Sequence, residues 1–140
     1  MAFEFPIRVY VEDTDGGGIV YHANHLKFCE RARTEWLRAQ QIEHYLKAGE
    51  YCFVVHGLSI EYHQPAYMDD LLSVSVEPVA CKSASFSLQQ VIRRAEMPLA
   101  TIRVRLACLD LQLQPRRIPE QIRSVLQQQI RHAACMPLHG

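Results

Sequence analysis

The sequence contains no long apolar run, no surplus of charge of either sign and no closely spaced pair of cysteines. Its 140 residues carry 15 basic and 15 acidic side chains, so the formal net charge is zero. Nucleic acids and anionic membrane surfaces bind basic fields, so we expect neither as a partner. No window approaches the roughly 18 to 20 consecutive apolar residues of a membrane-spanning helix. The first residues also lack the basic and apolar pattern of a secretion signal.

The cysteines are odd in number and widely separated in the sequence. None forms the C-x-x-C pair that is typical of a zinc knuckle or a redox centre. We therefore expect reduced thiols and a cytoplasmic protein. The five positions are Cys29, Cys52, Cys81, Cys108 and Cys135.

Hydrophobic periodicity predicts five strands and two helices. Alternating apolar positions indicate strands over about 3–11, 54–63, 72–77, 85–93 and 101–108. Apolar residues at three- and four-residue spacing predict a long helix from about Asn24, its expected N-cap, to about Gln40. Pro119 is expected to open a C-terminal helix that ends near Ile130.

These elements favour a single α+β domain over residues 1–140. The last three strands have short connections, which predicts an antiparallel meander. One sheet with one apolar face buries that face by wrapping around the long helix, where Cys29 and Ala32 are small enough for close approach. A wide sheet leaves edge strands that need cover, which favours dimerisation.

Two local features complete the helical prediction. A short helical turn is expected over Glu43–Lys47, ended by Gly49. Arg31 and Glu35 lie four residues apart on the long helix, so we expect a weak ion pair between them.

The segment from Glu12 to His22 holds three carboxylates, three consecutive glycines and a histidine, and it leads into the long helix. The free N–H groups and the dipole of a helix N-terminus stabilise negative charge, such as the oxyanion that forms from a carbonyl group. A carboxylate nearby can attack that carbonyl or activate a water molecule. Asp13 and Asp15 can equally be turn-forming residues, because aspartate and glycine are common in turns.

The run Tyr10–His25, YVEDTDGGGIVYHANH, resembles the motif of the 4-hydroxybenzoyl-CoA thioesterase family. Within that family it is most similar to the Tol-Pal-associated acyl-CoA thioesterases, the YbgC type. Supporting blocks follow in the same order at Phe28–Glu35, Phe53–Val55, Ile60–Ala66, Asp69–Asp70 and Pro115–Pro119.

The resemblance implies a hot-dog fold, in which a five-stranded antiparallel sheet wraps around a long central helix and a C-terminal helix follows. It implies hydrolysis of an acyl-CoA without a metal or other cofactor. It also implies a homodimer or homotetramer with the active site at the subunit interface, and an association with Tol-Pal or lipid-synthesis proteins.

The resemblance assigns catalysis to Asp15, which acts on the thioester carbonyl as nucleophile or as general base. It assigns polarisation of the thioester oxygen to the backbone N–H of His22, taken as the residue just before the helix. The His22 side chain either assists the reaction or only hydrogen-bonds the loop. Asp13 is expected to shape the loop, and we predict substrate contacts at Gly18 and Tyr21.

Cations are needed to bind the phosphates of CoA, and two pairs of residues are candidates. They are Lys82 with Ser83 and Arg116 with Arg117; for both pairs, ordinary surface charge is the alternative. Glu30 on the long helix is a reserve catalytic carboxylate.

Other functions stay open at this point. A non-catalytic acyl-CoA-binding or scaffold protein would keep the fold and the cations without needing Asp15. A hot-dog dehydratase would use His22 with a carboxylate. His22 and His25 with the loop aspartates match no strong metal-binding spacing, so we predict no metal. Cys29 faces the core by periodicity, which favours an inert packing role. His25 stands where aromatic residues are frequent in the family.

Overall fold

The structure, a computed structural model, describes residues 3–42 and 50–134. The helical turn expected over Glu43–Lys47 and the cysteine at position 135 lie outside these residues. In chain order the elements are β1 (Phe3–Arg8), a 3-10 helix (Val11–Asp13), α1 (Asn24–Ala39), β2 (Cys52–Tyr62), β3 (Leu71–Cys81), β4 (Ser85–Arg94), β5 (Met97–Leu109) and α3 (Glu120–Ala134).

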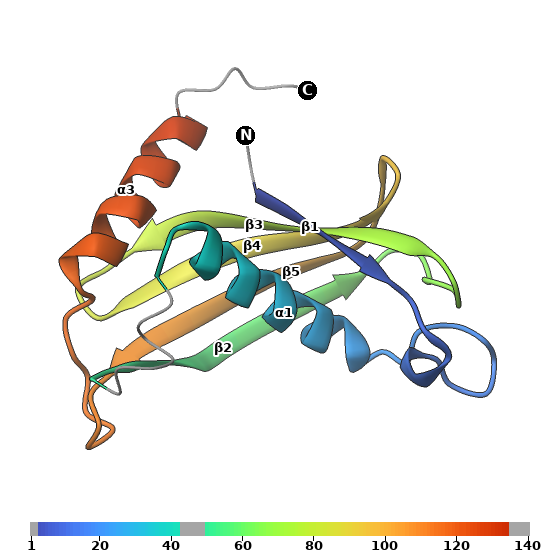
Figure 1. The fold of residues 1–140 in the computed structure, drawn as a ribbon, viewed down its shortest axis with the longest axis horizontal. Coiled ribbons are helices and arrows are strands. Elements are labelled where there is room, and N and C mark those ends of the chain that lie inside the picture. The colour runs from blue at the N-terminus through green and yellow to red at the C-terminus, as the bar shows by residue number, and fades with distance from the viewer. Residues whose placement is uncertain (1–2, 43–49, 135–140) are drawn as a thin grey trace.

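The strands form one antiparallel five-stranded sheet in the order β1-β3-β4-β5-β2. Helix α1 lies along one face of this sheet, and α3 lies at the end of the sheet remote from the loop that precedes α1 (Figure 1). The expected α+β hot-dog arrangement is therefore confirmed, including the meander of β3, β4 and β5. Within the described ranges, neither helix has the length and apolar character that crossing a bilayer requires.

The core forms where α1 meets the inner face of the sheet. On α1, Cys29 and Ala32 are fully buried and Trp36 is nearly so, which confirms the centre of the predicted apolar face. Because the first two side chains are small, the sheet approaches the helix closely there. The inward alternation predicted for β3, β4 and β5 is also confirmed, since the following residues are buried: Leu72, Val74, Val76, Phe86, Leu88, Ile92, Ile102, Val104, Leu106 and Cys108.

Strand β2 departs from the predicted simple alternation. Its ladder with β5 shifts register between Val55 and Gly57. Val54 pairs with the half-buried Ala107, whereas Leu58 pairs with the buried Val104. Uninterrupted alternation over the predicted strand 54–63 would place Val54 and Leu58 on one face. That prediction is wrong, because a β-bulge inserts one residue and inverts the side-chain pattern beyond it.

Three further predictions near α1 are wrong. The first strand ends at Arg8, and Val11 is 72% exposed in the 3-10 helix instead of facing inward from a strand. The N-cap of α1 is Ala23, since the side chain of Asn24 binds a carboxylate in the preceding loop. Glu35 pairs with Arg38, one turn further along α1, and not with the expected arginine four residues before it.

The two edges of the sheet differ in character. Strand β1 carries Pro6, which lacks a backbone N–H and so removes one donor from that edge. Strand β2 is eleven residues long and contains no proline. Its side chains Val55, Leu58 and Tyr62 are 45%, 42% and 48% exposed. The β2 edge is therefore the one that can accept another strand.

Candidate active site

The loop between β1 and α1 is organised around Asp13, which is only 5% exposed. Its carboxylate accepts the backbone N–H of Tyr10 at 2.9 Å and the side-chain amide of Asn24 at 3.0 Å. Its backbone carbonyl accepts the N–H of Tyr21 at 2.9 Å. Asp13 therefore ties together both ends of the loop and the start of α1, so the prediction that it shapes the loop is confirmed.

A tight turn carries Asp15 into solvent. Its backbone N–H donates to the carbonyl of Ile19 at 2.9 Å, and its own carbonyl accepts the N–H of Gly18 at 3.1 Å. Gly18 has a φ of +79°, a conformation that favours glycine. Asp15 Oδ1 accepts the N–H of Gly17 at 2.9 Å, whereas Oδ2 accepts no hydrogen bond from residues 3–42 and 50–134. Asp15 is thus a turn-former that keeps one carboxylate oxygen available.

Two backbone N–H groups are available where α1 begins. The carbonyl of Tyr21 accepts the N–H of Asn24 at 2.8 Å, which starts the helix. The N–H groups of His22 and Ala23 donate to none of the described residues. The prediction that His22 directly precedes the helix is wrong, because Ala23 lies between His22 and Asn24, the first residue of α1. Unused donors at a helix start are suited to bind a developing negative charge.

The structure places four of the predicted site residues in this one loop: Asp15, Gly18, Tyr21 and His22. Tyr21 and His22 are exposed, and their ring centroids lie 4.5 Å apart. Gly18 donates its N–H to the carbonyl of Asp15 and accepts the N–H of Met68, so its backbone is already used in holding the loop.

Beneath the loop lie His25 and Tyr62, which the sequence did not single out as site residues. The Tyr62 hydroxyl donates to the carbonyl of His22 at 2.6 Å, and His25 Nδ1 lies 3.2 Å from the same oxygen. Burial lowers the pKa of His25, opposed by the backbone hydrogen bonds at His22 and Tyr21. Burial, reinforced by the nearby Cys29 thiol, raises the pKa of Tyr62, so its hydroxyl remains a donor at neutral pH.

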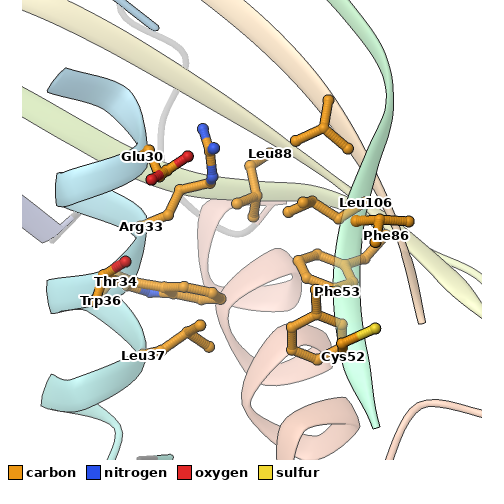
Figure 2. A pocket seen from close by; sticks show the side chains of 12 residues that line it. Glu30, Arg33, Thr34, Trp36, Leu37, Cys52, Phe53, Phe86, Leu88 and Leu106 are labelled. Atoms are coloured by element: carbon orange, nitrogen blue, oxygen red, sulfur yellow. The ribbon is translucent and has the colours of Figure 1, made fainter. Parts of the chain in front are cut away.

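A cavity of about 570 Å³ lies between α1 and β2. Figure 2 shows Arg33, Trp36 and Leu37 of α1 on one side, across from residues of β2 and the neighbouring strands. The other lining residues are Glu30, Thr34, Cys52, Phe53, Val54, Val55, Phe86, Leu88 and Leu106. Most of this wall is apolar, and its charged side chains, Glu30 and Arg33, come from the middle of α1, before Trp36 and Leu37.

A buried glutamine, Gln90, braces the polar end of the cavity. It is fully buried on β4, accepts a hydrogen bond from Arg33 Nη1 at 3.0 Å and donates to the carbonyl of Cys29 at 3.1 Å. Alternation alone put this position on the inner face, but did not explain a polar residue there. Its amide satisfies a helix carbonyl and an arginine that would otherwise lack these partners.

The predicted CoA-binding residues lie at the other end of the molecule. Lys82 and Ser83 form the β3–β4 turn, and Arg116 and Arg117 lie between β5 and α3. Ile118 donates its N–H to the Ser83 carbonyl at 2.9 Å, which brings the two pairs together. This end of the sheet is opposite the loop that carries Asp15 (Figure 1). A single chain therefore brings the candidate cations together but does not place them beside Asp15.

Arg123 on α3 is a further residue at this end that the sequence did not reveal. It is 9% exposed, and its Nη2 atom donates to the carbonyls of Lys82 and Ser83 at 2.9 and 2.8 Å. Two accepted hydrogen bonds hold the turn in a fixed shape. The sequence places Arg123 on the C-terminal helix, and an arginine on a helix is usually a surface charge. Its role becomes clear only from its contacts with the β3–β4 turn.

The other candidates have simple surroundings. Burial raises the pKa of the Cys29 thiol to about 12, only partly offset by Arg33, so an inert packing role for this residue is supported. Glu30 is exposed on α1. Across the parts of the chain that the structure describes, no three His, Cys, Asp or Glu side chains gather where they could hold a metal ion.

Comparison with known proteins identifies the family to which the chain belongs. Residues 9–128 match the model of the thioesterase-like superfamily. The chain is 42% identical over 125 residues to the acyl-CoA thioesterase YbgC of Haemophilus influenzae, which covers 87% of this chain and 92% of that protein. It is also 42% identical over 123 residues to the acyl-CoA thioester hydrolase YbgC of Escherichia coli, with coverage of 86% and 92%.

Solved structures agree with the sequence relatives. A probable thioesterase from Bartonella henselae superposes with a TM-score of 0.78 at 36% identity, covering 85% of this chain and 100% of that one. The family match over residues 9–128 includes the loop that precedes α1, helix α1 and strands β2 to β5.

Proposed function

The chain belongs to the thioesterase-like superfamily, and on that premise we propose that it hydrolyses acyl-CoA to the free acid and CoA. Asp15 acts on the thioester carbonyl, and the backbone N–H groups at the start of α1 polarise the carbonyl oxygen. Water supplies the oxygen of the new acid, the bond between the carbonyl carbon and sulfur breaks, and the CoA thiolate takes up a proton.

One observation carries this proposal. The carboxylate of Asp15 is exposed, is held through Oδ1 and keeps Oδ2 available, in the same short loop as the unused N–H groups of His22 and Ala23. Acyl transfer requires such a pair of functions, a nucleophile or base on one side of the carbonyl and donors for the oxyanion. Asp15 serves either by direct attack, through a mixed anhydride, or as general base for water.

The acyl group occupies the cavity between α1 and β2. The two elements on either side of the cavity also meet beneath the loop, where the His25 ring on α1 contacts the Tyr62 ring on β2 with centroids 5.0 Å apart. The helix rises about 9 Å from Asn24 to Glu30 and about 20 Å to Leu37, at roughly 1.5 Å per residue. An acyl chain that runs along α1 from the loop therefore passes Glu30 and Arg33 before it reaches the apolar part of the cavity.

The complete site requires a homodimer formed through the β2 edges. Identical strands related by a two-fold axis pair antiparallel, so the Cys52 end of one β2 lies beside the Tyr62 end of its partner. The Tyr62 end contacts the Asp15 loop. The Cys52 end adjoins the cations, because the Arg116 guanidinium stacks on the Tyr51 ring at 5.1 Å. Each protomer thus supplies phosphate-binding cations to the loop of the other.

The experiment that tests the proposal is an assay of CoA release across short, medium, long and aromatic acyl-CoAs. The variant Asp15→Asn should lower kcat by a hundredfold or more, on the order seen for groups acting only in the transition state. The control Glu12→Gln changes an exposed carboxylate in the same loop that makes no hydrogen bond to the described residues, and should retain activity. In a single turnover in ¹⁸O-labelled water, label enters Asp15 only if Asp15 is the nucleophile and water attacks the aspartyl carbon of the mixed anhydride, so that an Asp15 oxygen passes to the acid. By every other route the label enters the acid directly.

Each other result identifies a different function or residue. Equal activity of wild type and Asp15→Asn would make Asp15 the wrong residue, and Glu30 the next to change. Binding of acyl-CoA without hydrolysis would identify an acyl-CoA-binding protein. The side-chain role of His22, the absence of a cofactor and the association with Tol-Pal or lipid-synthesis proteins stay predictions.

A further inference from the structure

The carbonyl oxygen of His22 is held by two side chains from different elements. The Tyr62 hydroxyl at the end of β2 donates to it at 2.6 Å, and His25 Nδ1 in the first turn of α1 lies 3.2 Å away. A carbonyl oxygen only accepts hydrogen bonds, so a bonded Nδ1 must carry a proton. Both acceptor positions of this carbonyl are therefore filled from within the protein.

The ring of His25 is fixed in this role by its surroundings. It is 3% exposed and meets the Tyr62 ring edge to face, with an interplanar angle of 88°. Its other nitrogen, Nε2, is buried without a hydrogen-bond partner among the described residues. A positive charge there would be buried and unpaired, which is costly. The neutral ring with its proton on Nδ1 satisfies the contact to His22.

Holding this carbonyl also directs a backbone donor. In a planar trans peptide, the C=O of one residue and the N–H of the next point in opposite directions. Fixing the His22 carbonyl therefore fixes the N–H of Ala23, which donates to no residue in the described ranges. The preceding peptide is fixed in the same way, because the Tyr21 carbonyl accepts the N–H of Asn24 and directs the N–H of His22.

We propose that His25 and Tyr62 are positioning residues that orient the peptide between His22 and Ala23, so that the Ala23 N–H joins the His22 N–H in binding the thioester oxygen. This inference rests on the proposed function, since it assigns a second donor to the same site. Two donors bind the oxyanion of the tetrahedral state more strongly than the planar carbonyl of the substrate. Their correct direction should therefore affect kcat more than KM.

Two matched sets of variants test the proposal. Tyr62→Phe removes only the hydroxyl, with Tyr67→Phe as its control, because the exposed Tyr67 hydroxyl has no partner in the described residues. His25→Leu removes the ring donor at similar volume, whereas His25→Asn is smaller but keeps a donor near the Nδ1 position. We expect kcat to fall on the order of tenfold to a hundredfold in Tyr62→Phe and His25→Leu, with KM within about twofold and partial recovery in His25→Asn.

A second readout separates this inference from the proposed function. Long-range ¹H–¹⁵N correlation spectra of the wild type should show His25 protonated at Nδ1, and Tyr62→Phe should shift the amide resonances of His22 and Ala23. Unchanged kcat in Tyr62→Phe, or equal kcat in His25→Asn and His25→Leu, would overturn the proposal. If the wild type hydrolyses no acyl-CoA, the proposed function fails, and the spectra alone decide: a proton on Nε2 or unmoved amides would refute the orienting role.

Discussion

Asn24, the first residue of α1, donates a side-chain hydrogen bond across 3.0 Å to the buried carboxylate of Asp13. The same carboxylate accepts the N–H of Tyr10. Both carboxylate oxygens therefore accept hydrogen bonds, and the loop that carries Asp15 is attached through Asp13 to the start of α1.

Replacing Asp13 should damage stability and activity together. Asp13→Asn places an amide NH₂ group opposite a donor, which leaves a buried polar group unsatisfied and should cost about 1 to 3 kcal/mol of unfolding free energy. Urea unfolding measures this loss. Asp15→Asn is the contrasting variant, because its Oδ1 still accepts the Gly17 N–H; it should lose activity with a stability change below about 0.5 kcal/mol. An Asp13→Asn protein of wild-type stability would contradict the tethering role.

The glycines of the loop should respond differently to alanine. Gly18 has a positive φ of 79°, so Gly18→Ala strains the turn by about 1 to 2 kcal/mol and displaces Asp15. Gly16 has open space where a Cβ would lie, so Gly16→Ala is the matched control. The midpoint temperature of thermal unfolding and kcat should both fall for Gly18→Ala and remain near the wild-type values for Gly16→Ala. Equal effects would show that the turn tolerates other backbone conformations.

Arg123 should influence substrate binding without touching the reacting atoms. Arg123→Gln removes the two hydrogen bonds to the Lys82 and Ser83 carbonyls and loosens the β3–β4 turn. We expect KM for acyl-CoA to rise about tenfold, with little change in KM for an acyl thioester of N-acetylcysteamine, which lacks phosphates. Arg131→Gln, exposed on the same helix, is the control. An equal rise for both substrates would place the effect elsewhere than at the phosphates.

The oligomeric state should depend on the β2 edge. Leu58→Glu adds a charge to an exposed apolar position of that strand, and burial of an unpaired charge opposes association. Sedimentation velocity should show a shift from dimer to monomer and a matching loss of kcat/KM. Leu111→Glu alters another exposed leucine, outside the sheet, and should leave the dimer intact. A Leu58→Glu dimer with full activity would exclude this edge as the interface.

His25 should make stability depend on pH. Burial lowers its pKa below the ordinary value of 6.5, so the unfolded chain binds more protons than the folded one as the pH falls. The contribution of neutral His25 is fully present above roughly pH 6.5 and is lost progressively below it. Urea unfolding of wild type and His25→Asn at about pH 7.5 and about pH 5.5 should show a larger acid loss in the wild type. Equal losses would mean that His25 titrates normally.

The sequence predicted the parts of the fold in which one pattern repeats without interruption. Strands β3, β4 and β5 alternate regularly, and each predicted inward residue is buried. Strand β2 was predicted less well, because its bulge between Val55 and Gly57 interrupts the alternation, and the isolated glycine that is typical of such a bulge was not interpreted as one. Val11 continues the alternation of β1 in the sequence. In the structure the Asp13 carboxylate accepts the Tyr10 N–H, and the chain forms a 3-10 helix over Val11–Asp13 in place of a longer strand.

The candidate site was predicted as a set of residues but not as an arrangement. The motif pointed to Asp15 and His22 as candidates, and because they are close in sequence the structure necessarily places them in one loop. His25 and Tyr62 are far apart in sequence and meet only when β2 lies beside α1, so no local pattern connects them. The contacts of Arg123 could not be predicted either. Its acceptors are backbone carbonyls, which every residue carries, so no residue type in the sequence marks them.

The ladder between β1 and β3 joins the first strand to a strand in the second half of the chain, with Phe3 opposite Val76. Pairings this distant in sequence carry a larger loop-closure cost and form more slowly than a local meander. Strands β3, β4 and β5 should therefore assemble early, and β1 should join them later. The loop that carries Asp15 follows β1 directly, so Asp15 and its neighbours in the loop should become ordered among the last as the chain folds.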